Sequence, residues 1–247
     1  ARRMTLEGAK VVCVCEIMPH SSGLRRNIAQ CLDDFGIPLY LQHTIVEIRG
    51  KERVEGVVVA AVDKDKRPIA GTEKVFECDT VLFSVGLIPE NELTKGAGIP
   101  LDGRTKGCTV DGDRETQAEG IFACGNVLHV HDLVDFVSEE AEIAGSAAAE
   151  YLFGGERQKR LIPVQAGQNV SYVLPQRLDA ASESPQKLYF RVTGAIKNAV
   201  VRVEGGDGVR EWKKIAVAPG EMEHITLPPA YFREAEGLCV SVLAQEA

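Results

Sequence analysis

Three hydrophobic patterns follow one another in the first third of the chain. Residues 10–15 read Lys-Val-Val-Cys-Val-Cys and are followed by Glu16, a pattern typical of a buried parallel strand with a polar residue at its carboxyl end. Apolar side chains then recur at helical spacing between residues 21 and 35, and Gly36 marks the expected end of that helix. Residues 44–78 alternate between apolar and polar positions and contain Gly and Pro turns, which predicts a meander of antiparallel strands.

The middle of the chain predicts two further strands and one long helix. Residues 80–85 form an apolar run that indicates a buried strand, and residues 121–123 form a second, shorter one that stops at Gly125. A helix is expected to begin near residues 132–135 and to run through a series of small residues to Gly154 and Gly155.

The last third of the chain has a different character. It contains short, largely β-type runs separated by Gly and Pro turns, at residues 169–174, 187–192, 199–203, 212–217, 224–227 and 238–243. This pattern predicts a small antiparallel β domain or sandwich over residues 161–247.

Composition excludes several classes of protein. The 28 Lys and Arg residues are scattered and are outnumbered by 36 Asp and Glu, for a net charge of −8, which disfavours a nucleic-acid groove and an anionic membrane surface. No apolar run approaches the roughly 20 residues that a membrane span needs. The cysteine count of seven is odd, and several lie in apolar runs, which suits free thiols in a reducing compartment. We therefore expect a cytoplasmic protein.

A motif surrounds the second short strand. Residues 116–126 read Thr-Gln-Ala-Glu-Gly-Ile-Phe-Ala-Cys-Gly-Asn, so that Gly125 and Asn126 would lie at the carboxyl edge of a sheet, where α/β folds bind ligands. The segment resembles the second flavin-binding motif of the thioredoxin-reductase-like and pyridine nucleotide-disulfide oxidoreductase flavoproteins, written T-x-x-x-G-[VI]-[FY]-A-x-G-D. The resemblance implies that the following helix directs its positive N-terminal end, at Val134 and Asp135, toward an electron-rich flavin oxygen.

Asn126 departs from that motif, because the family has Asp at this position. The family carboxylate accepts a hydrogen bond from the flavin ribitol, and an amide oxygen can accept the same bond. Loss of one negative charge favours the anionic reduced flavin, so the change is expected to alter redox tuning more than binding.

A second motif lies upstream of the first. Residues 79–91 read Asp-Thr-Val-Leu-Phe-Ser-Val-Gly-Leu-Ile-Pro-Glu-Asn and resemble the family segment D-x-V-[LI]-x-A-x-G-x-x-P-N. There a buried strand leads to a close-packed Gly and a Pro turn, which makes Gly86 and Pro89 candidate cofactor-binding residues.

Glu16 is the candidate for binding the nicotinamide nucleotide. An acidic residue at such a strand end accepts the adenosine ribose hydroxyls in dinucleotide-binding βαβ units. The Gly-x-Gly-x-x-Gly turn of that unit would lie just before Ala1, so we expect the chain to begin inside a domain. Arg25 and Arg26 could bind the 2′-phosphate of NADP, but the Glu16 carboxylate would repel it. NAD is therefore predicted, with both arginines on an exposed helix face.

Two further sets of residues carry possible chemistry. Cys13 and Cys15 face the same side of their strand, but no matching His or Cys pair accompanies them, so core packing is the preferred interpretation. His129 and His131, followed by Asp132, could be hydrogen-bonded structural histidines, polar groups beside the flavin, or metal ligands, in that order of preference. No metal site is predicted, because the sequence supplies no further ligands nearby.

These patterns and the resemblance predict an α/β chain with an incomplete two-dinucleotide-binding-domain (Rossmann-like) flavoprotein fold and a C-terminal antiparallel β domain. Residues 1–85 would form part of an NAD-binding domain, residues 86–155 the C-terminal part of an FAD-binding domain, and residues 161–247 the β domain. The resemblance implies an FAD-dependent oxidoreductase that exchanges a hydride between NAD(H) and flavin and passes electrons to or from a small-molecule substrate or a partner subunit. The alternative is a non-catalytic or electron-relay subunit of a multi-component dehydrogenase.

Overall fold

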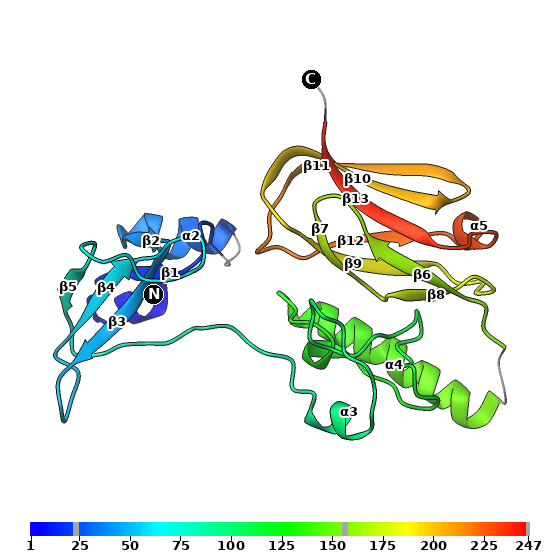
Figure 1. Cartoon of the computed structure of the whole chain (residues 1–247), viewed down its shortest axis with the longest axis horizontal. Helices are drawn as coiled ribbons and strands as arrows, with labels where there is room; N and C mark the ends of the chain where they lie inside the picture. The colour runs from blue at the N-terminus through cyan, green and yellow to red at the C-terminus, as the bar shows by residue number, and fades with distance from the viewer. Residues whose placement is uncertain (22–24, 155–157, 246–247) are drawn as a thin grey trace. The chain divides into compact units, whose positions relative to one another are not determined.

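The computed structural model describes residues 1–21, 25–154 and 158–245, and the side chain of Arg25 lies outside that description. The chain divides into two compact units, residues 1–85 and residues 86–247 (Figure 1). The second unit contains both the long helix and the β-rich C-terminal part.

The first unit contains a small parallel sheet and a separate antiparallel one. Its elements are α1 (Arg2–Leu6), β1 (Val14–Glu16), α2 (Arg25–Cys31), the 3₁₀ turn η1 (Asp33–Phe35), β2 (Leu39–Leu41), β3 (His43–Arg49), β4 (Gly56–Ala61) and β5 (Lys74–Glu77). Strands β1 and β2 pair in parallel, and β3, β4 and β5 form the predicted antiparallel meander. Gly36 ends the helical segment with φ 63°, a left-handed conformation that glycine adopts without steric cost.

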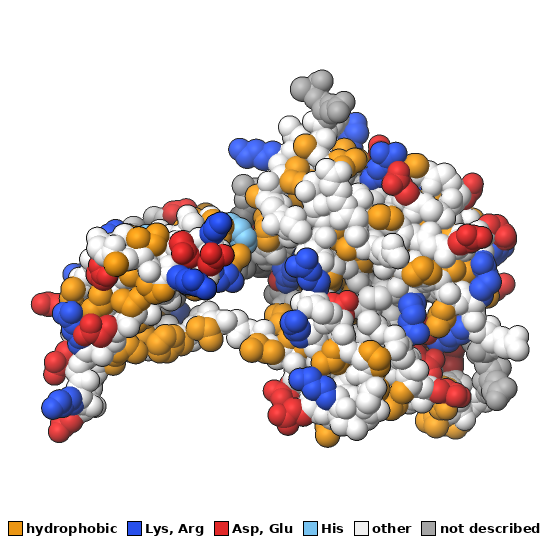
Figure 2. Space-filling view, in the orientation of Figure 1, with side chains coloured by type: hydrophobic (Ala, Val, Ile, Leu, Met, Phe, Trp, Pro, Cys, Tyr) orange, Lys and Arg blue, Asp and Glu red, His pale blue; other side chains and the backbone are white. Residues whose placement is uncertain are grey.

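Two strand predictions in the first unit need correction. The strand predicted over residues 10–15 is shorter, because only Val14–Glu16 pairs with a neighbour, and its side chains are half-buried. Residues 80–85 are not a strand; Phe83 and Val85 expose 65% and 87% of their surface. Figure 2 shows hydrophobic side chains along this extended segment. A strand needs neighbours for its backbone N–H and C=O groups, and none of the described residues pairs with this run.

The second unit begins with α3 (Glu92–Gly96), the 3₁₀ turn η2 (Gly125–Val127) and α4 (Val134–Gly154). The predicted strand over residues 121–123 is wrong: only an isolated bridge joins Phe122 to Glu115. The predicted long helix is confirmed as α4, whose last predicted neighbour, Gly155, lies outside the described residues. In the described part of the chain, no helix combines the length and apolarity that crossing a membrane requires.

Residues 161–245 form a two-layered β-sandwich. Its elements are β6 (Leu161–Ala166), β7 (Val170–Leu174), β8 (Arg177–Asp179), β9 (Gln186–Val192), β10 (Ile196–Gly206), β11 (Gly208–Val217), β12 (Glu223–Leu227), α5 (Pro229–Phe232) and β13 (Leu238–Ala244). One sheet has the order β11-β10-β13-β6-β8 and the other β12-β9-β7. All six predicted β runs are strands. The pairing is antiparallel except between β13 and β6.

The sandwich core comes from the alternation along its strands. In β10 and β13 every second side chain is buried, as expected where one face of a sheet packs on another layer. Leu188 and Phe190 of β9 meet Val201 and Val240 of the other sheet in one apolar cluster, against which Trp212 packs from β11.

Leu188→Ala should lower the free energy of unfolding of the sandwich by about 2–5 kcal/mol, because it leaves a cavity at a fully buried site. Trp212 is the only tryptophan and packs on this core, so its fluorescence in a urea titration reports the loss. Ile215→Ala is the matched control, since Ile215 is 91% exposed on β11 and its truncation should change stability by less than about 0.5 kcal/mol. Equal effects of the two substitutions would contradict the assigned core.

Candidate functional site

The candidate site is built around the turn at Gly125. Gly125 is buried and has φ 72°, and a Cβ atom there would lie 3.3 Å from Cγ1 of Val137. The preceding motif residue Thr116 closes its own loop, because its N–H donates to Ile121 O at 2.8 Å and its hydroxyl bonds to Ala118. The Thr and Gly residues of the motif therefore have local conformational roles, and Asn126 follows them as an exposed side chain.

A buried carboxylate from α4 lies beneath this turn. Glu140 is fully buried, and its Oε2 atom accepts a hydrogen bond from the N–H of Gly125 at 3.0 Å. Its Oε1 atom lies 3.3 Å from Nε2 of His129 and 3.4 Å from Nε of Arg114. Nε2 of His131 lies 3.2 Å from Oε2. We call Arg114, His129, His131 and Glu140 the Glu140 cluster.

The Glu140 cluster also holds Asn126. Oδ1 of Asn126 lies 3.1 Å from the backbone nitrogen of His131 and 3.3 Å from Nδ1 of the same residue. Asn91, two residues after Pro89, donates from Nδ2 to Val127 O at 2.9 Å and to Lys106 O at 3.0 Å. The two sequence motifs are therefore joined at η2 through Asn91.

Electrostatics within the cluster favour an ionised carboxylate. Burial alone would raise the pKa of Glu140, but the hydrogen bond with His129, the adjacent imidazole of His131 and the charge of Arg114 hold that pKa well below its ordinary value. Burial lowers the pKa of His129, although the Glu140 carboxylate acts in the opposite direction. The combination is a buried anion compensated by one permanent cation.

The β-sandwich encloses this cluster from one side. The hydroxyl of Tyr172, on β7, lies 3.2 Å from Nδ1 of His129. Asp132 bonds to Arg191 of β9 at 2.6 Å and accepts the N–H of Met222 at 2.6 Å. The neighbouring carboxylate Glu139 is directed to β9 instead, where it bonds to Lys187 and Tyr189. The sandwich thus supplies part of the surroundings of the candidate site.

The three possible metal ligands are brought together. One ligand atom from each of His129, His131 and Glu140 lies within 4.8 Å of the others. Arg114 already supplies the positive charge that balances Glu140, so a divalent cation would add uncompensated charge in a buried place. The cluster is better described as a buried ion pair extended by hydrogen-bonded histidines.

None of the described contacts of the Glu140 cluster involves the remaining predicted site residues. Val134 and Asp135 begin α4 and are exposed, Val134 by 74%. Gly86 has φ 88°, which suits glycine, but no heavy atom would lie within 4 Å of a Cβ there, so the expected close packing is absent. Pro89 follows in the same extended segment.

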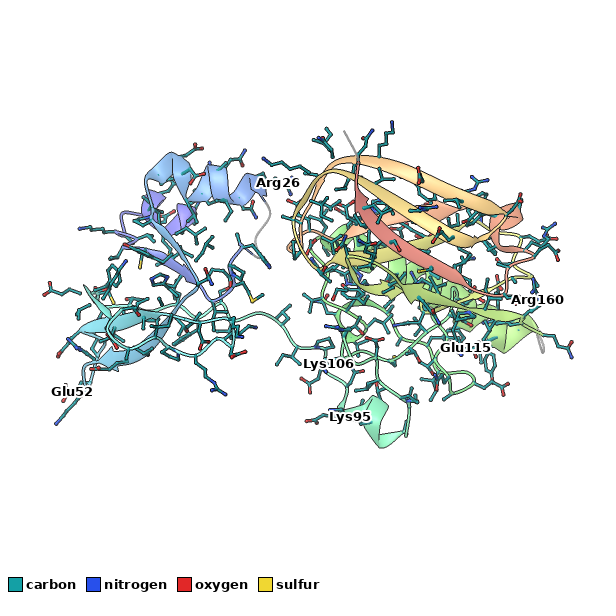
Figure 3. The ribbon with its side chains drawn as sticks, turned by 45° about the horizontal axis from the view of Figure 1, so that its top comes forward. Arg26, Glu52, Lys95, Lys106, Glu115 and Arg160 are labelled. Atoms are coloured by element: carbon teal, nitrogen blue, oxygen red, sulfur yellow. The ribbon has the colours of Figure 1, made fainter. Side chains whose placement is uncertain are left out.

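Glu16 lies at the end of β1, as predicted. Its Oε1 atom accepts the N–H of Met18 at 3.0 Å. Arg26 is exposed on α2, as expected (Figure 3), whereas the side chain of Arg25 is outside the described part. Cys13 and Cys15 are half-buried free thiols, and burial raises the pKa of Cys15 to about 12, which disfavours thiolate chemistry.

Glu140 and Arg114 were missed by sequence reasoning. A signal for Glu140 was available, since it follows Val137 by three residues and precedes Ala144 by four, which places a carboxylate on the buried face of the helix. Arg114 had no comparable signal, because it lies in a polar turn between Asp111 and Glu115.

The carboxylates of Asp111 and Glu115 both contact the ammonium group of Lys159, at 2.8 and 2.9 Å, and Glu115 is labelled in Figure 3.

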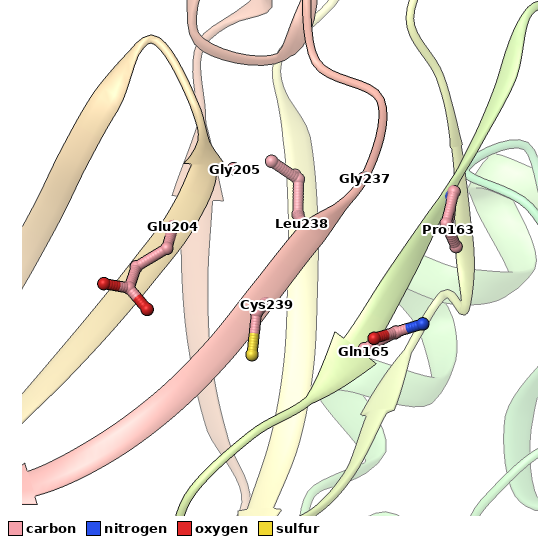
Figure 4. Close-up of a pocket in the computed structure, with 7 residues that line it drawn as sticks. All are labelled: Pro163, Gln165, Glu204, Gly205, Gly237, Leu238 and Cys239. Carbon is pink, nitrogen blue, oxygen red and sulfur yellow. The ribbon is translucent and has the colours of Figure 1, made fainter.

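A shallow groove lies elsewhere, on the sandwich beside β13 (Figure 4). It is lined by Pro163, Gln165, Glu204, Gly205, Gly237, Leu238 and Cys239. Gly205 has φ 99° and approaches the backbone of Gly237, so backbone closes one part of the groove. Its polar side chains form no acid–base or metal-binding set, and we assign it no chemistry.

Comparison with known proteins decides the family. Residues 6–150, more than half of the chain, match the family described as pyridine nucleotide-disulphide oxidoreductase. The chain belongs to this family. The matched range includes Glu16, Gly86, Pro89, the Gly125 turn and most of α4, and it ends before the β-sandwich. The resemblance seen in the two motifs is thereby confirmed.

Individual relatives are distant. The chain is 22% identical over 207 residues to a nitric oxide reductase FlRd-NAD(+) reductase of Salmonella agona, a match that covers 84% of the chain and 50% of that protein. It is 36% identical over 85 residues to a probable ferredoxin reductase CtmF of Castellaniella defragrans, which covers 33% of the chain and 20% of that protein. The chain thus spans about half the length of the first of these relatives, and less of the second.

Solved structures resemble the chain only loosely. The flavoprotein disulfide reductase RclA from Escherichia coli, solved as a Cu(II) complex, matches with a TM-score of 0.43 and 18% identity, over 90% of this chain and 49% of that one. A thioredoxin reductase from Streptococcus pyogenes matches with a TM-score of 0.35 and 22% identity, over 62% of this chain and 48% of that one.

The Glu140 cluster predicts a stability that falls on acidification. The pKa values of His129 and Glu140 are lower in the folded chain, so the unfolded chain binds more protons as pH falls. Their stabilisation is present at neutral pH. It should decline below pH 6.5 for His129 and below pH 4.5 for Glu140, each by at most about 1.4 kcal/mol per pH unit.

His129→Gln should therefore reduce the loss of unfolding free energy just below pH 6.5. Urea titrations followed by Trp212 fluorescence at a series of pH values measure this loss. Burial also lowers the pKa of His224, so His224→Gln gives the contribution of a second histidine in the same pH range. If the profile of His129→Gln matched that of the unsubstituted protein, His129 would not titrate with folding.

Proposed function

We propose that the natural protein containing this chain is an FAD-dependent oxidoreductase that exchanges a hydride between NAD(H) and flavin. The observation that carries the proposal is the family match over residues 6–150, in which the Gly125 turn leads into the N-terminus of α4. Residues 1–85 would belong to the NAD-binding domain, residues 86–155 to the FAD-binding domain, and residues 161–247 to an added β domain.

The residues at the turn fit a flavin. Asn126 is an exposed amide, and the first-turn N–H groups of α4, at Val134 and Asp135, have no acceptor within the helix. Val134 offers an exposed apolar surface beside these donors. When bound, the flavin would supply the hydride chemistry, whereas Gly125, Asn126 and the start of α4 would hold and orient it. The Asp135 carboxylate, at the same helix end, would repel a negatively charged ring oxygen and so offset part of the attraction of the helix N-terminus.

Nucleotide binding is assigned to the first unit. Glu16 would accept the adenosine ribose hydroxyls, and its charge favours NAD over NADP. Gly86 and Pro89 would contribute the segment that connects to the flavin-binding residues. The free cysteines are consistent with a cytoplasmic location, which is part of the proposal.

The second substrate is proposed to be a redox partner. Two relatives are named as reductases of FlRd and of ferredoxin, and a similar protein-borne electron acceptor suits this chain. A small-molecule substrate is the alternative second substrate in this proposal. An electron-relay subunit is the competing function, because the described residues offer no acid–base pair on an open surface near Asn126.

A visible spectrum of the complete natural polypeptide, before and after anaerobic addition of NADH, tests the function. A yellow protein that NADH bleaches supports an NADH-linked oxidoreductase. A yellow protein that does not respond would indicate a relay subunit, and a colourless protein that takes up no FAD would contradict the proposal.

Gly125→Val in the complete protein should reduce flavin retention. Valine at φ 72° is strained by about 1–3 kcal/mol, or roughly 5- to 100-fold in a binding equilibrium, and it would press on Val137. Flavin content per polypeptide is the measurement, with Trp212 fluorescence as a check on the sandwich. Gly145→Val is the control, since Gly145 lies within α4 in open space. Full flavin occupancy in Gly125→Val would remove this turn from the flavin site.

Glu16→Ala should weaken the use of NADH by roughly 10- to 100-fold, because hydrogen bonds to a charged group contribute about 1.5–3 kcal/mol. NADPH, whose 2′-phosphate the carboxylate repels, should lose little or gain. The rate of flavin reduction by each nucleotide, over a range of concentrations, checks the prediction. Equal losses for both nucleotides would mean that Glu16 only supports the fold through its bond to Met18.

A further inference from the structure

The orientation of the Asn126 amide is determined by its neighbour. The backbone nitrogen of His131 can only donate, so the amide atom 3.1 Å from it must be the oxygen. The same Oδ1 atom is 3.3 Å from Nδ1 of His131. The oxygen of Asn126 therefore faces His131, which leaves the NH₂ group of this exposed side chain for another partner.

The side chain of His131 lies against Glu140. The imidazole is 1% exposed, and its Nε2 atom, 3.2 Å from Oε2 of Glu140, has no hydrogen bond of good geometry to any described residue. The ring thus lies between Asn126, on its Nδ1 side, and the buried carboxylate, on its Nε2 side.

One carboxylate therefore lies beside both Gly125 and the residue that bonds to Asn126. Oε2 of Glu140 accepts the N–H of Gly125 directly and faces the ring that holds Asn126. Arg114, 3.4 Å from Oε1, keeps this carboxylate charged in a buried place. Glu139, the adjacent carboxylate on the same helix, instead hydrogen-bonds to Lys187 and Tyr189 of β9.

We infer that Asn126 presents its NH₂ group, a hydrogen-bond donor, to an oxygen of the flavin's ribityl chain, and that His131 and Glu140 are positioning residues that hold the amide in this orientation. The inference rests on the proposed function. It reverses the polarity expected from the family motif, in which a carboxylate accepts a hydrogen bond at this position. The NH₂ group of Asn126 is neutral, so it does not bring the negative charge that the family's Asp carboxylate has at this position.

The test uses the complete natural protein with asparagine labelled with ¹⁵N. The side-chain NH₂ resonances of Asn126 are identified by their loss in Asn126→Asp. Addition of FAD to the apoprotein should shift these resonances, whereas the backbone N–H of His131 should stay protected from hydrogen exchange because Oδ1 remains its acceptor. Unshifted NH₂ resonances in FAD-saturated protein, or loss of protection at His131, would overturn the inference.

The positioning role is tested with substitutions at two neighbouring carboxylates. Glu140→Gln should raise the dissociation constant of FAD about 10-fold or more and speed hydrogen exchange at Gly125 in the apoprotein, since an ionic hydrogen-bond network is lost. Glu139→Gln, one residue away, should change neither. Trp212 fluorescence checks folding of the sandwich.

If Glu140→Gln does not fold, His131→Leu replaces it, because this variant leaves the contacts of Glu140 with Arg114 and Gly125 intact. It removes the Nδ1 contact with Asn126 but keeps the backbone N–H of His131, so it should weaken FAD binding several-fold and alter the NH₂ resonances of Asn126 in the apoprotein. Unchanged FAD affinity in whichever of these variants folds would overturn the positioning role. If the unsubstituted protein binds no FAD, the proposed function fails and this inference fails with it.

Discussion

The second unit depends on one buried carboxylate. An ionised group removed from water is costly unless it is paired and hydrogen-bonded. Glu140 is paired with Arg114 and hydrogen-bonded to His129 and to the N–H of Gly125. These partners come from segments that are far apart in the sequence. Glu140 of α4 therefore contacts both the Arg114 loop and the Gly125 turn. The bond between His129 and Tyr172 connects this group to the β-sandwich.

Local signals in the sequence were sufficient wherever an element is stabilised by near neighbours. The meander of β3, β4 and β5 is marked by its Gly and Pro turns, and strands of the sandwich such as β10 and β13 alternate in the way that half-buried strands require. The end of the α2 segment at Gly36 and the turn at Gly125 follow from glycine's access to positive φ. These features were predicted from patterns of a few residues.

Predictions failed where an element needs partners from distant parts of a sheet. Residues 80–85 have the apolar composition of a buried strand, but no described strand pairs with them, and residues 121–123 reach only one bridge. The Glu140 cluster was anticipated only in part for a related reason. His129 and His131 were evident as candidates, whereas the approach of Arg114 and Tyr172 depends on tertiary packing that periodicity does not describe.

The identity of residue 126 is consistent with the charge beneath the turn. A carboxylate at this position would place a second negative charge beside His131, whose other ring nitrogen already faces Glu140. Like charges that lie close together repel and raise each other's pKa, and here one of the two would be fully buried. An amide keeps an oxygen for His131 without that repulsion. The departure of Asn126 from the family motif and the buried Glu140 are thus two parts of one electrostatic arrangement.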